Sequence, residues 1–540
     1  MEFYNFLRKE AKDFDNNIFL VGGFSGVANA LLIFVFTTAA GKIGGGGSNI
    51  LYPALAMLCL VAYWASKRYL LKRTTIIVEG VVHRIRLRIA DNIRMADLGS
   101  FEKIGGAPLY NAISTHTLNI SQAATAIINS TTSLIMLILA FLFIYFLSPT
   151  AFYIVATTLC LLVILFSSNR KALLAKMDEV SSKDNDFVEG FNDLLMGFKE
   201  LKMSSAKSED FMQHCLKSQA ESTQRLKIEA GTIINSSTII AQCSLYILLA
   251  AVLFLLPVIQ PAEAAKIIPV VAIVVFIFGP IGEVISVYPF LTRAIASINE
   301  IYRVEALLKE IHEPGASEEA VPFISPGDFS RVRCDNLSFD YRDKAGASSF
   351  SLNPFHFQIQ RGEIVFIVGG NGSGKSTFLK VFCGLYPAKT GSILVNDRTV
   401  TPGNIVGYRN LICPIFSDFH LFDRLYGVSG LDEQRVQDLL EFVHLSQHTQ
   451  IVRGRISNRN LSSGQRKRLA LVVATLEDKP FYVFDEWAAE QDPGFRKTFY
   501  EEYLVSLRQA GKTILAVTHD EKYFQVADRI VKMEYGEFKA

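Results

Sequence analysis

The first 300 residues contain six long apolar stretches with few or no charges, and this pattern limits the fold more than any other feature of the chain. Each stretch is long enough to cross a bilayer as a helix. The sequence therefore predicts an all-α, multi-pass membrane domain of the six-helix type found in type IV exporters. The six stretches are Ile18–Ala40, Ile50–Leu71, Thr131–Leu147, Ala151–Phe166, Ile233–Pro257 and Ile267–Phe290.

The connections between these stretches are unequal in length. Three are short, whereas those at 72–130 and 167–232 are long and rich in Lys and Arg. The positive-inside rule places the long connections, and with them both termini, in the cytoplasm. Their apolar residues recur at helical spacing, which predicts helical hairpins with tips at Phe101–Leu109 and Ser204–Phe211. Such hairpins suit levers that touch a cytoplasmic domain; a purely structural bundle is the alternative.

The remainder of the chain has the composition of an ordinary charged α/β domain. We expect a membrane domain at 1–312, a polar linker at 313–328 and a soluble domain at 329–540. The net charge of +2 indicates no preference for acidic or basic partners, and no nucleic acid is expected to bind. The seven cysteines are scattered without metal-ligand spacing, which favours free thiols.

A glycine-rich loop follows the apolar run Ile364–Val368, and a helix-compatible segment follows the loop. This strand–loop–helix pattern is the sequence form of a phosphate-binding loop. The glycines let backbone N–H groups converge on phosphate oxygens, Lys375 adds a positive charge, and the Ser376 hydroxyl is suited to Mg²⁺. The loop predicts binding of ATP or a related nucleotide through Gly369, Gly370, Asn371, Gly372, Ser373, Gly374, Lys375, Ser376 and Thr377.

Three further motifs follow this loop in the sequence. Leu461–Gln465 opens a helical segment whose first N–H groups suit a γ-phosphate, which makes candidates of Ser462, Ser463, Gly464 and Gln465. The apolar run 481–484 ends at Asp485, suited to hold Mg²⁺, and Glu486, suited to polarise a water. Another apolar run ends at His519, which is placed to reach the γ-phosphate. Taken singly, the first motif could be only an N-cap and His519 only a turn residue.

In this order the motifs resemble the ATP-binding cassette superfamily, in its exporter type with six spans fused to one cassette. The resemblance implies that Tyr341 stacks on adenine, Asp492 belongs to the D-loop, and the signature Leu461–Gln465 closes over ATP held by a second copy. It therefore implies a half-transporter that works as a homodimer. The glutamine usual in the Q-loop falls on Ser417, whose shorter side chain would approach Mg²⁺ through water.

Two segments narrow the resemblance. Phe416–Phe422 and the run Asp485–Pro493 are similar to those of bacterial cyclic-peptide and siderophore exporters, of the pyoverdine and syringomycin type. This similarity implies ATP-driven export of a peptide-like small molecule across the bacterial cytoplasmic membrane. An importer of the same architecture, a lipid flippase and a membrane-tethered regulatory ATPase remain alternatives.

Polar side chains within the apolar stretches are candidates for binding the cargo. They are costly in lipid, and they face either water or another helix. Glu283 is the one acidic residue in the six stretches, and pairing with Arg293 is its structural alternative. Helix–helix hydrogen bonding is the alternative for the other three candidates, Asn129, Asn235 and Gln242.

Overall fold

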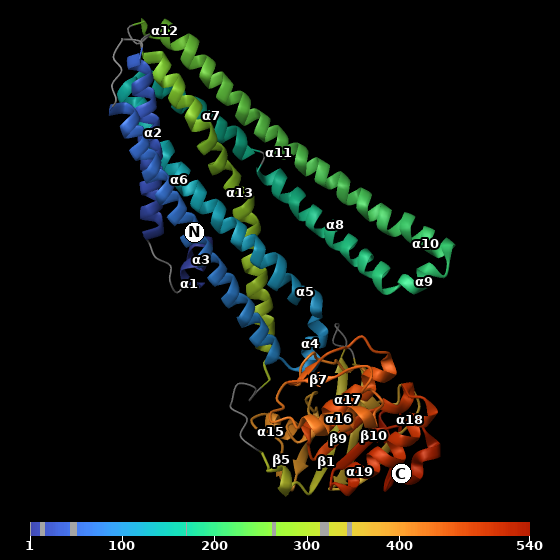
Figure 1. The fold of residues 1–540 in the computed structure, drawn as a ribbon. Coiled ribbons are helices and arrows are strands. Elements are labelled where there is room, and N and C mark those ends of the chain that lie inside the picture. The colour runs from blue at the N-terminus through green and yellow to red at the C-terminus, as the bar shows by residue number, and fades with distance from the viewer. Residues whose placement is uncertain are drawn as a thin grey trace. The chain divides into compact units, whose positions relative to one another are not determined.

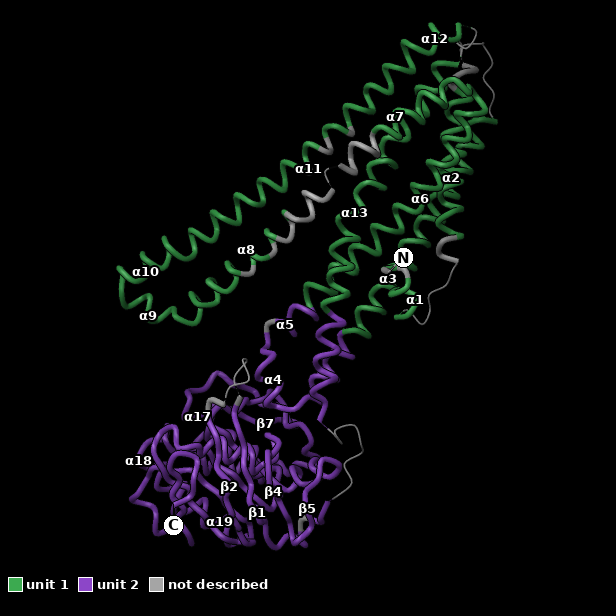
Figure 2. The backbone as a smooth tube through the Cα atoms, turned by 180° about the vertical axis from the view of Figure 1, so that it is seen from behind, with its two compact units in different colours: residues 1–85, 114–300 green, residues 86–113, 301–540 purple. Residues whose placement is uncertain are grey.

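The computed structural model describes residues 2–10, 17–43, 51–168, 170–261, 266–313, 323–342 and 348–539. Most of the predicted linker and of the short connection 41–49 lies outside these residues. The chain forms two compact units (Figure 2). Unit 1 comprises residues 1–85 and 114–300, and unit 2 comprises residues 86–113 and 301–540.

Unit 1 is built from helices joined by short connections, with no strand among its described residues (Figure 1). Helix α2 packs along α6, and α8 runs beside α11 as a hairpin closed by α9 and α10. The helices are α1(Glu2–Glu10), α2(Asn17–Ile43), most of α3(Leu51–Arg94), α6(Thr117–Leu147), α7(Pro149–Ser168), α8(Arg170–Met196), α9(Phe198–Lys202), α10(Ser205–Phe211), α11(Ser218–Ala250), α12(Leu256–Ile259) and most of α13(Ile267–Glu310), with π-helical segments η2(Met212–Lys217) and η3(Ala251–Leu255).

Within the described residues, five helical segments are long and apolar enough to cross a membrane. The sequence predicts six. The apolar part of α7 that the structure describes, Pro149–Leu161, is shorter than the other five, so the remaining span stays a prediction. A buried cluster contributed by α6, α7, α11 and α13 holds these helices together, with Ile144, Val155, Leu248 and Ile273 fully buried.

Unit 2 begins with the end of α3, followed by α4(Leu98–Ile104), α5(Gly106–Asn111) and the start of η1(Ala112–His116). Backbone and side-chain contacts tie this segment to the end of α13. Arg88 forms an ion pair with Glu305 at 2.7 Å, and the Asp97 N–H donates to the Ile311 carbonyl at 3.0 Å. These contacts explain why residues 86–113 group with the C-terminal part of the chain.

The soluble part of unit 2 is built on three sheets. The largest has the order β12-β11-β3-β10-β9-β6, with all neighbours parallel except β12. An antiparallel sheet has the order β2-β1-β4-β5, and β7 pairs with β8. The strands are β1(Arg331–Arg342), β2(Ser348–Gln360), β3(Ile364–Val368), β4(Thr390–Val395), β5(Arg398–Thr399), β6(Ile412–Ile415), β7(Ile451–Val452), β8(Arg455–Ile456), β9(Phe481–Asp485), β10(Thr513–Val517), β11(Arg529–Glu534) and β12(Glu537–Lys539).

Core clusters cover both faces of the central strands β3, β9 and β10, which is why these strands are apolar along almost their whole length. Along β3, Ile364 and Phe366 enter one core cluster while Val365 and Ile367 enter the other. The helical segments are η5(Pro326–Asp328), α14(Lys375–Phe382), α15(Ile405–Arg409), α16(Glu433–Phe442), α17(Ser463–Glu477), η6(Trp487–Glu490), α18(Pro493–Lys497), η7(Thr498–Tyr503), α19(Leu504–Gln509) and η8(Glu521–Val526).

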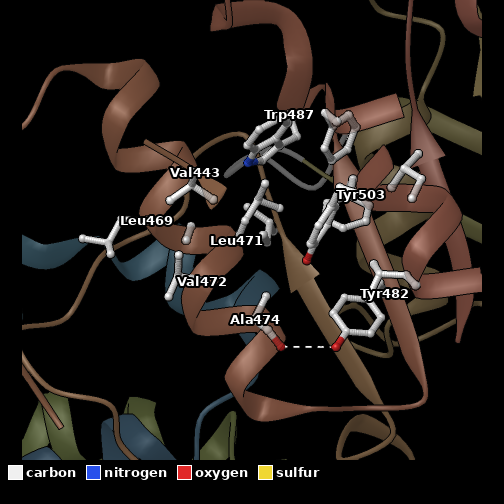
Figure 3. Packing of buried hydrophobic residues seen from close by; sticks show 14 of the residues in the cluster. Val443, Leu469, Leu471, Val472, Ala474, Tyr482, Trp487 and Tyr503 are labelled. Atoms are coloured by element: carbon white, nitrogen blue, oxygen red, sulfur yellow. Dashed lines mark hydrogen bonds between the residues drawn. The ribbon is translucent and has the colours of Figure 1, made fainter. Parts of the chain in front are cut away.

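The cluster that contains Ile364 and Phe366 joins α16 and α17 to β9 through aromatic packing (Figure 3). Tyr482 and Trp487 are almost fully buried there, and the Tyr482 hydroxyl donates to the Ala474 carbonyl at 3.4 Å. A buried hydroxyl without a partner is costly, so this hydrogen bond is what makes a tyrosine acceptable at a fully buried position. The contact fixes α17 against the strand that ends in the predicted catalytic residues.

Gly391 tests the close approach of β4 to β1. It has φ +84°, and a Cβ there would lie 2.3 Å from the Asn336 carbonyl oxygen and 2.4 Å from that of Asp335. We expect Gly391→Ala to lower the melting temperature of the full chain by roughly 5 °C or more, from backbone strain and the clash together. Gly403→Ala is the control, because nothing lies within 4 Å of its Cβ position. Scanning fluorimetry measures both; equal melting temperatures would contradict the prediction.

Candidate active site

Four parallel strands end at one edge of the largest sheet, and each is followed by predicted site residues. The loop Gly369–Gly374 follows β3, Ser417 lies just after β6, Asp485 ends β9, and His519 lies just after β10. In parallel sheets the carboxyl ends of neighbouring strands meet in one crevice, which is where ligands bind. The strand order β3-β10-β9-β6 therefore brings together residues from 369 to 519.

The phosphate loop turns into α14 at Gly374, which has φ +102° and caps the helix. A Cβ at Gly374 would lie 2.6 Å from the Phe350 ring, so only glycine fits this close approach. The Lys375 ammonium is buried and donates to the Gly369 and Gly370 carbonyls, each at 3.0 Å. The Ser373 hydroxyl is also buried and has no partner among the described residues. These donors fit a phosphate.

Two hydroxyls converge on one carboxylate beside this loop. The Ser376 Oγ donates to Asp485 Oδ1 at 3.1 Å, and the Ser417 Oγ donates to Asp485 Oδ2 at 3.2 Å. Burial raises the pKa of Asp485, while the two hydroxyls act in the opposite direction. Hard oxygen donors in small number suit Mg²⁺, which keeps waters and phosphate oxygens as its other ligands. The residues fit Mg²⁺ in this way, and Ser417 lies within hydrogen-bonding distance of the carboxylate that is predicted to bind the metal.

Glu486 is the point at which the predicted catalytic groups meet. Its Oε1 lies 3.2 Å from His519 Nε2 and 3.6 Å from Lys375 Nζ. Glu486 has φ +48°, a left-handed conformation that is uncommon outside glycine, so the chain turns sharply after β9. The turn aims Glu486 and the buried Asp485 in different directions. This geometry suits a carboxylate that accepts a proton from water beside a phosphate.

The signature segment forms the start of α17. Ser462 and Gln465 make a reciprocal capping box: each side chain accepts from the other residue's backbone N–H, at 3.3 and 3.0 Å. This segment can cap the helix and still bind a phosphate. The capping box occupies Ser462 and Gln465, and it leaves the two residues between them free of the box. The backbone N–H groups of Ser463 and Gly464 lie in the first turn of α17, whose positive dipole end attracts anions.

The run that follows Glu486 holds the signature segment in place. The Trp487 indole donates to the Lys467 carbonyl at 3.0 Å, and the Gln491 amide donates to the Gly464 carbonyl at 3.1 Å. Arg468 donates to Gln491 at 2.8 Å and forms an ion pair with Asp492. Sequence reasoning missed the roles of Trp487, Gln491 and Arg468. Their hydrogen bonds join the run after Glu486 to α17, and the sequence alone does not show that these two segments meet.

Tyr341, predicted to stack on adenine, lies near the end of β1 and is 38% exposed. Its hydroxyl lies 3.4 Å from a Glu102 carboxylate oxygen on α4. Glu102 also accepts from Tyr386 at 2.6 Å and from Lys380 at 3.2 Å. Burial and the hydrogen bond to Glu102 raise the pKa of Tyr386, which keeps the phenol protonated. Sequence reasoning placed α4 at a hairpin tip but missed Glu102, which joins α4 to the helix behind the phosphate loop.

The four predicted cargo residues form no single cluster. Asn129 accepts from the Lys67 ammonium at 3.0 Å, and Glu283 accepts a hydrogen bond from Ser133 of another helix. Asn235 and Gln242 are exposed on α11, and no hydrogen bond joins them to Asn129 or Glu283 within the described part of the chain.

Sequence comparisons match both the nucleotide-binding part alone and most of the chain. A family model described as ABC transporter matches residues 352–489. The chain is 32% identical over 467 residues to the ATP-binding protein SyrD of Pseudomonas syringae pv. syringae, covering 84% of this chain and 82% of that protein. It is 22% identical over 481 residues to the ATP-dependent lipid A-core flippase of Hahella chejuensis, covering 85% of this chain and 79% of that protein.

A solved structure extends the likeness to the whole fold. The structure of a bacterial Atm1-family ABC exporter with ATP bound superposes with a TM-score of 0.75 at 16% identity, covering 97% of this chain and 93% of that one. The predicted fold class is confirmed: a helical membrane domain with long apolar helices precedes an α/β nucleotide-binding domain.

Glu486 gives the sharpest test of this site. We expect Glu486→Gln to bind ATP normally but to hydrolyse it on the order of 10²-fold more slowly, because the base that polarises water is lost. Glu502→Gln is the matched control, since Glu502 is exposed and accepts from Thr498 at 3.4 Å instead of contacting the catalytic groups. Phosphate release and nucleotide binding are measured on the purified chain. A normal rate in Glu486→Gln would move the role of base elsewhere, first to His519.

The role of Ser417 is tested by the dependence of hydrolysis on Mg²⁺. We expect Ser417→Ala to raise the Mg²⁺ concentration for half-maximal hydrolysis by roughly 10-fold, since a partner of the metal-binding carboxylate is lost. Ser417→Gln, with the family's usual residue, should restore the dependence. Ser506→Ala, which removes a hydroxyl bonded to the Tyr503 carbonyl, is the control. Identical Mg²⁺ curves for Ser417→Ala and the unaltered chain would exclude this role.

Proposed function

This chain belongs to the ATP-binding cassette transporters, as an exporter half-transporter, and we propose that two copies of it export a peptide-like small molecule across the bacterial cytoplasmic membrane. The ATPase activity of the cassette is coupled to transport, and the chain is a multi-pass membrane protein. We assign the membrane domain to residues 1–312, the linker to 313–328 and the cassette to 329–540, with both termini in the cytoplasm.

The observation that carries the proposal is the convergence of Lys375, Asp485, Glu486 and His519 at one strand-end crevice of the cassette. A site of this composition suits hydrolysis of a phosphoanhydride. Lys375 neutralises charge on the β- and γ-phosphates, and Glu486 accepts a proton from the attacking water. His519 orients the Glu486 carboxylate through its Nε2 contact. Mg²⁺, when bound, neutralises developing phosphate charge, and Asp485, Ser376 and Ser417 would hold it.

A second copy is proposed because one chain carries one cassette and one signature segment. The tip of the hairpin, from the end of α8 through α9, also exposes large apolar side chains: Met196 is 79%, Phe198 59% and Met203 86% exposed. Exposed apolar side chains gathered at one place are typical of a contact surface. A second copy of this chain is the partner that the half-transporter architecture requires.

The cargo class rests on motif resemblance and on the relative in Pseudomonas syringae. The segments 416–422 and 485–493 are similar to those of bacterial cyclic-peptide and siderophore exporters. The more distant relative in Hahella chejuensis is named as a lipid A-core flippase, so lipid translocation is the alternative that the test must separate. An importer and a regulatory ATPase are the others.

ATP-driven uptake into inside-out vesicles tests the proposal. The full chain is reconstituted, and a labelled mixture of short peptides is the probe. We expect ATP-dependent peptide accumulation, and none with Lys375→Ala, which lacks the charge on the phosphates. Uptake only into right-side-out vesicles would indicate import. Transfer of a labelled lipid without peptide uptake would indicate a flippase, and absence of both would favour a regulatory ATPase.

A further inference from the structure

Two opposite charges in unit 1 are both fixed to α6, one helical turn apart. Lys67 on α3 donates to Asn129 at 3.0 Å, and Glu283 on α13 accepts from Ser133. Asn129 and Ser133 are four residues apart on α6, so their side chains lie on the same face with Cβ atoms about 6 Å apart. Three helices distant in sequence thus bring a cation and an anion to one place.

The helix lengths put both charges at one depth. Lys67 lies sixteen residues from the start of α3 at Leu51, and Glu283 lies sixteen residues from the start of α13 at Ile267. At 1.5 Å per residue each is about 24 Å along its helix. Ser133 lies fourteen residues before the end of α6 at Leu147, or about 21 Å. Counted from these helix ends, Lys67, Glu283 and Ser133 all lie within about 30 Å, the thickness of a hydrocarbon core.

The two charges keep hydrogen-bonding capacity for a ligand. Lys67 has three donors and uses one on Asn129, and Glu283 uses one oxygen on the buried Ser133 hydroxyl while its own side chain is exposed. Over the residues that the structure describes, no ion pair joins Lys67 to Glu283. Charges at this depth are costly unless they bind each other or a polar ligand.

We propose that Lys67 and Glu283, positioned by Asn129 and Ser133, form a binding site for a cargo that carries both an anionic and a cationic group. The carboxylate of a peptide binds Lys67, and its ammonium group binds Glu283. This inference rests on the proposed function and specifies its cargo as zwitterionic. The same charges are present in a phosphatidylethanolamine headgroup, and we assign the site to the peptide-like cargo.

Peptide-stimulated ATP hydrolysis tests the proposal. The full chain is reconstituted in phosphatidylglycerol vesicles, which lack zwitterionic headgroups, and the probes are tetrapeptide mixtures with free, N-acetylated or C-amidated ends. We expect the free form to stimulate at a concentration on the order of 10-fold lower than either capped form, because each end makes a charge-assisted hydrogen bond. No stimulation, or equal stimulation by all three forms, would overturn the proposal without any variant.

Neutral variants separate binding of cargo from helix packing. Lys67→Gln keeps a donor for Asn129 and Glu283→Gln keeps an acceptor for Ser133, so both preserve the helix contacts and remove only the charge. We expect Lys67→Gln to weaken the response to free and acetylated peptides on the order of 10-fold and to leave the amidated form unaffected. Glu283→Gln should weaken the response to free and amidated peptides and leave the acetylated form unaffected. Ser244→Ala, whose hydroxyl bonds only the Ile240 carbonyl of its own helix, is the control.

Other outcomes of these experiments distinguish the proposed cargo site from the proposed function and from a lipid site. Responses equal to those of the unaltered chain in both neutral variants would overturn the proposal, while retained peptide uptake would leave the proposed function intact. Loss of uptake by the unaltered chain would overturn both. Stimulation by added phosphatidylethanolamine alone, lost in both variants, would assign the site to a lipid headgroup instead. Where a neutral variant fails to fold, Lys67→Arg and Glu283→Asp replace it, and each should respond like the unaltered chain.

Discussion

Parallel pairing of β3, β10, β9 and β6 is the constraint from which the cassette site follows. The central strands β3, β10 and β9 are buried on both faces, so their functional polar residues occur where a strand ends. Because the four ends share one edge, Ser376, Ser417 and Asp485 meet although up to 109 positions separate them. A slip of one residue in β9 would exchange the faces of Asp485 and Glu486. The carboxylate proposed to bind Mg²⁺ and the one proposed to polarise water would then both be misplaced.

Contacts within unit 2 connect this edge to two other segments. Glu102 links α4 to Lys380 on α14 and to Tyr341, so the position of α4 is linked to the helix that follows the phosphate loop. On the other side, Trp487 and Gln491 tie the start of α17 to the turn after Glu486. A change at the phosphates can therefore reach α4 and the signature segment through direct contacts, without a long relay.

The sequence predicted what depends on local pattern. The phosphate loop, the strand ending at Asp485 and the apolar helices all follow from spacing and composition, and the structure brings Lys375, Glu486 and His519 together as expected. Partners across elements were not predictable. The sequence around Glu102 does not indicate its hydrogen bond with Tyr386. Lys67 looks like an interfacial lysine in the sequence, and only the structure shows that it donates to Asn129 of α6. The hydrogen bond between Glu283 and Ser133 was equally unpredictable, because Ser133 lies on another helix.

The central claim is that Lys375 of one copy and the signature segment of another act on the same nucleotide. A structure of the full-length Glu486→Gln variant with Mg²⁺ and ATP tests it most directly, because slow hydrolysis retains the nucleotide. The account predicts a dimer in which the β- and γ-phosphates contact Lys375 of one copy while the N–H groups of Ser463 and Gly464 of the second copy contact the γ-phosphate. A monomer with bound ATP, or a nucleotide contacted by Lys375 and Ser463 of the same copy, would contradict it.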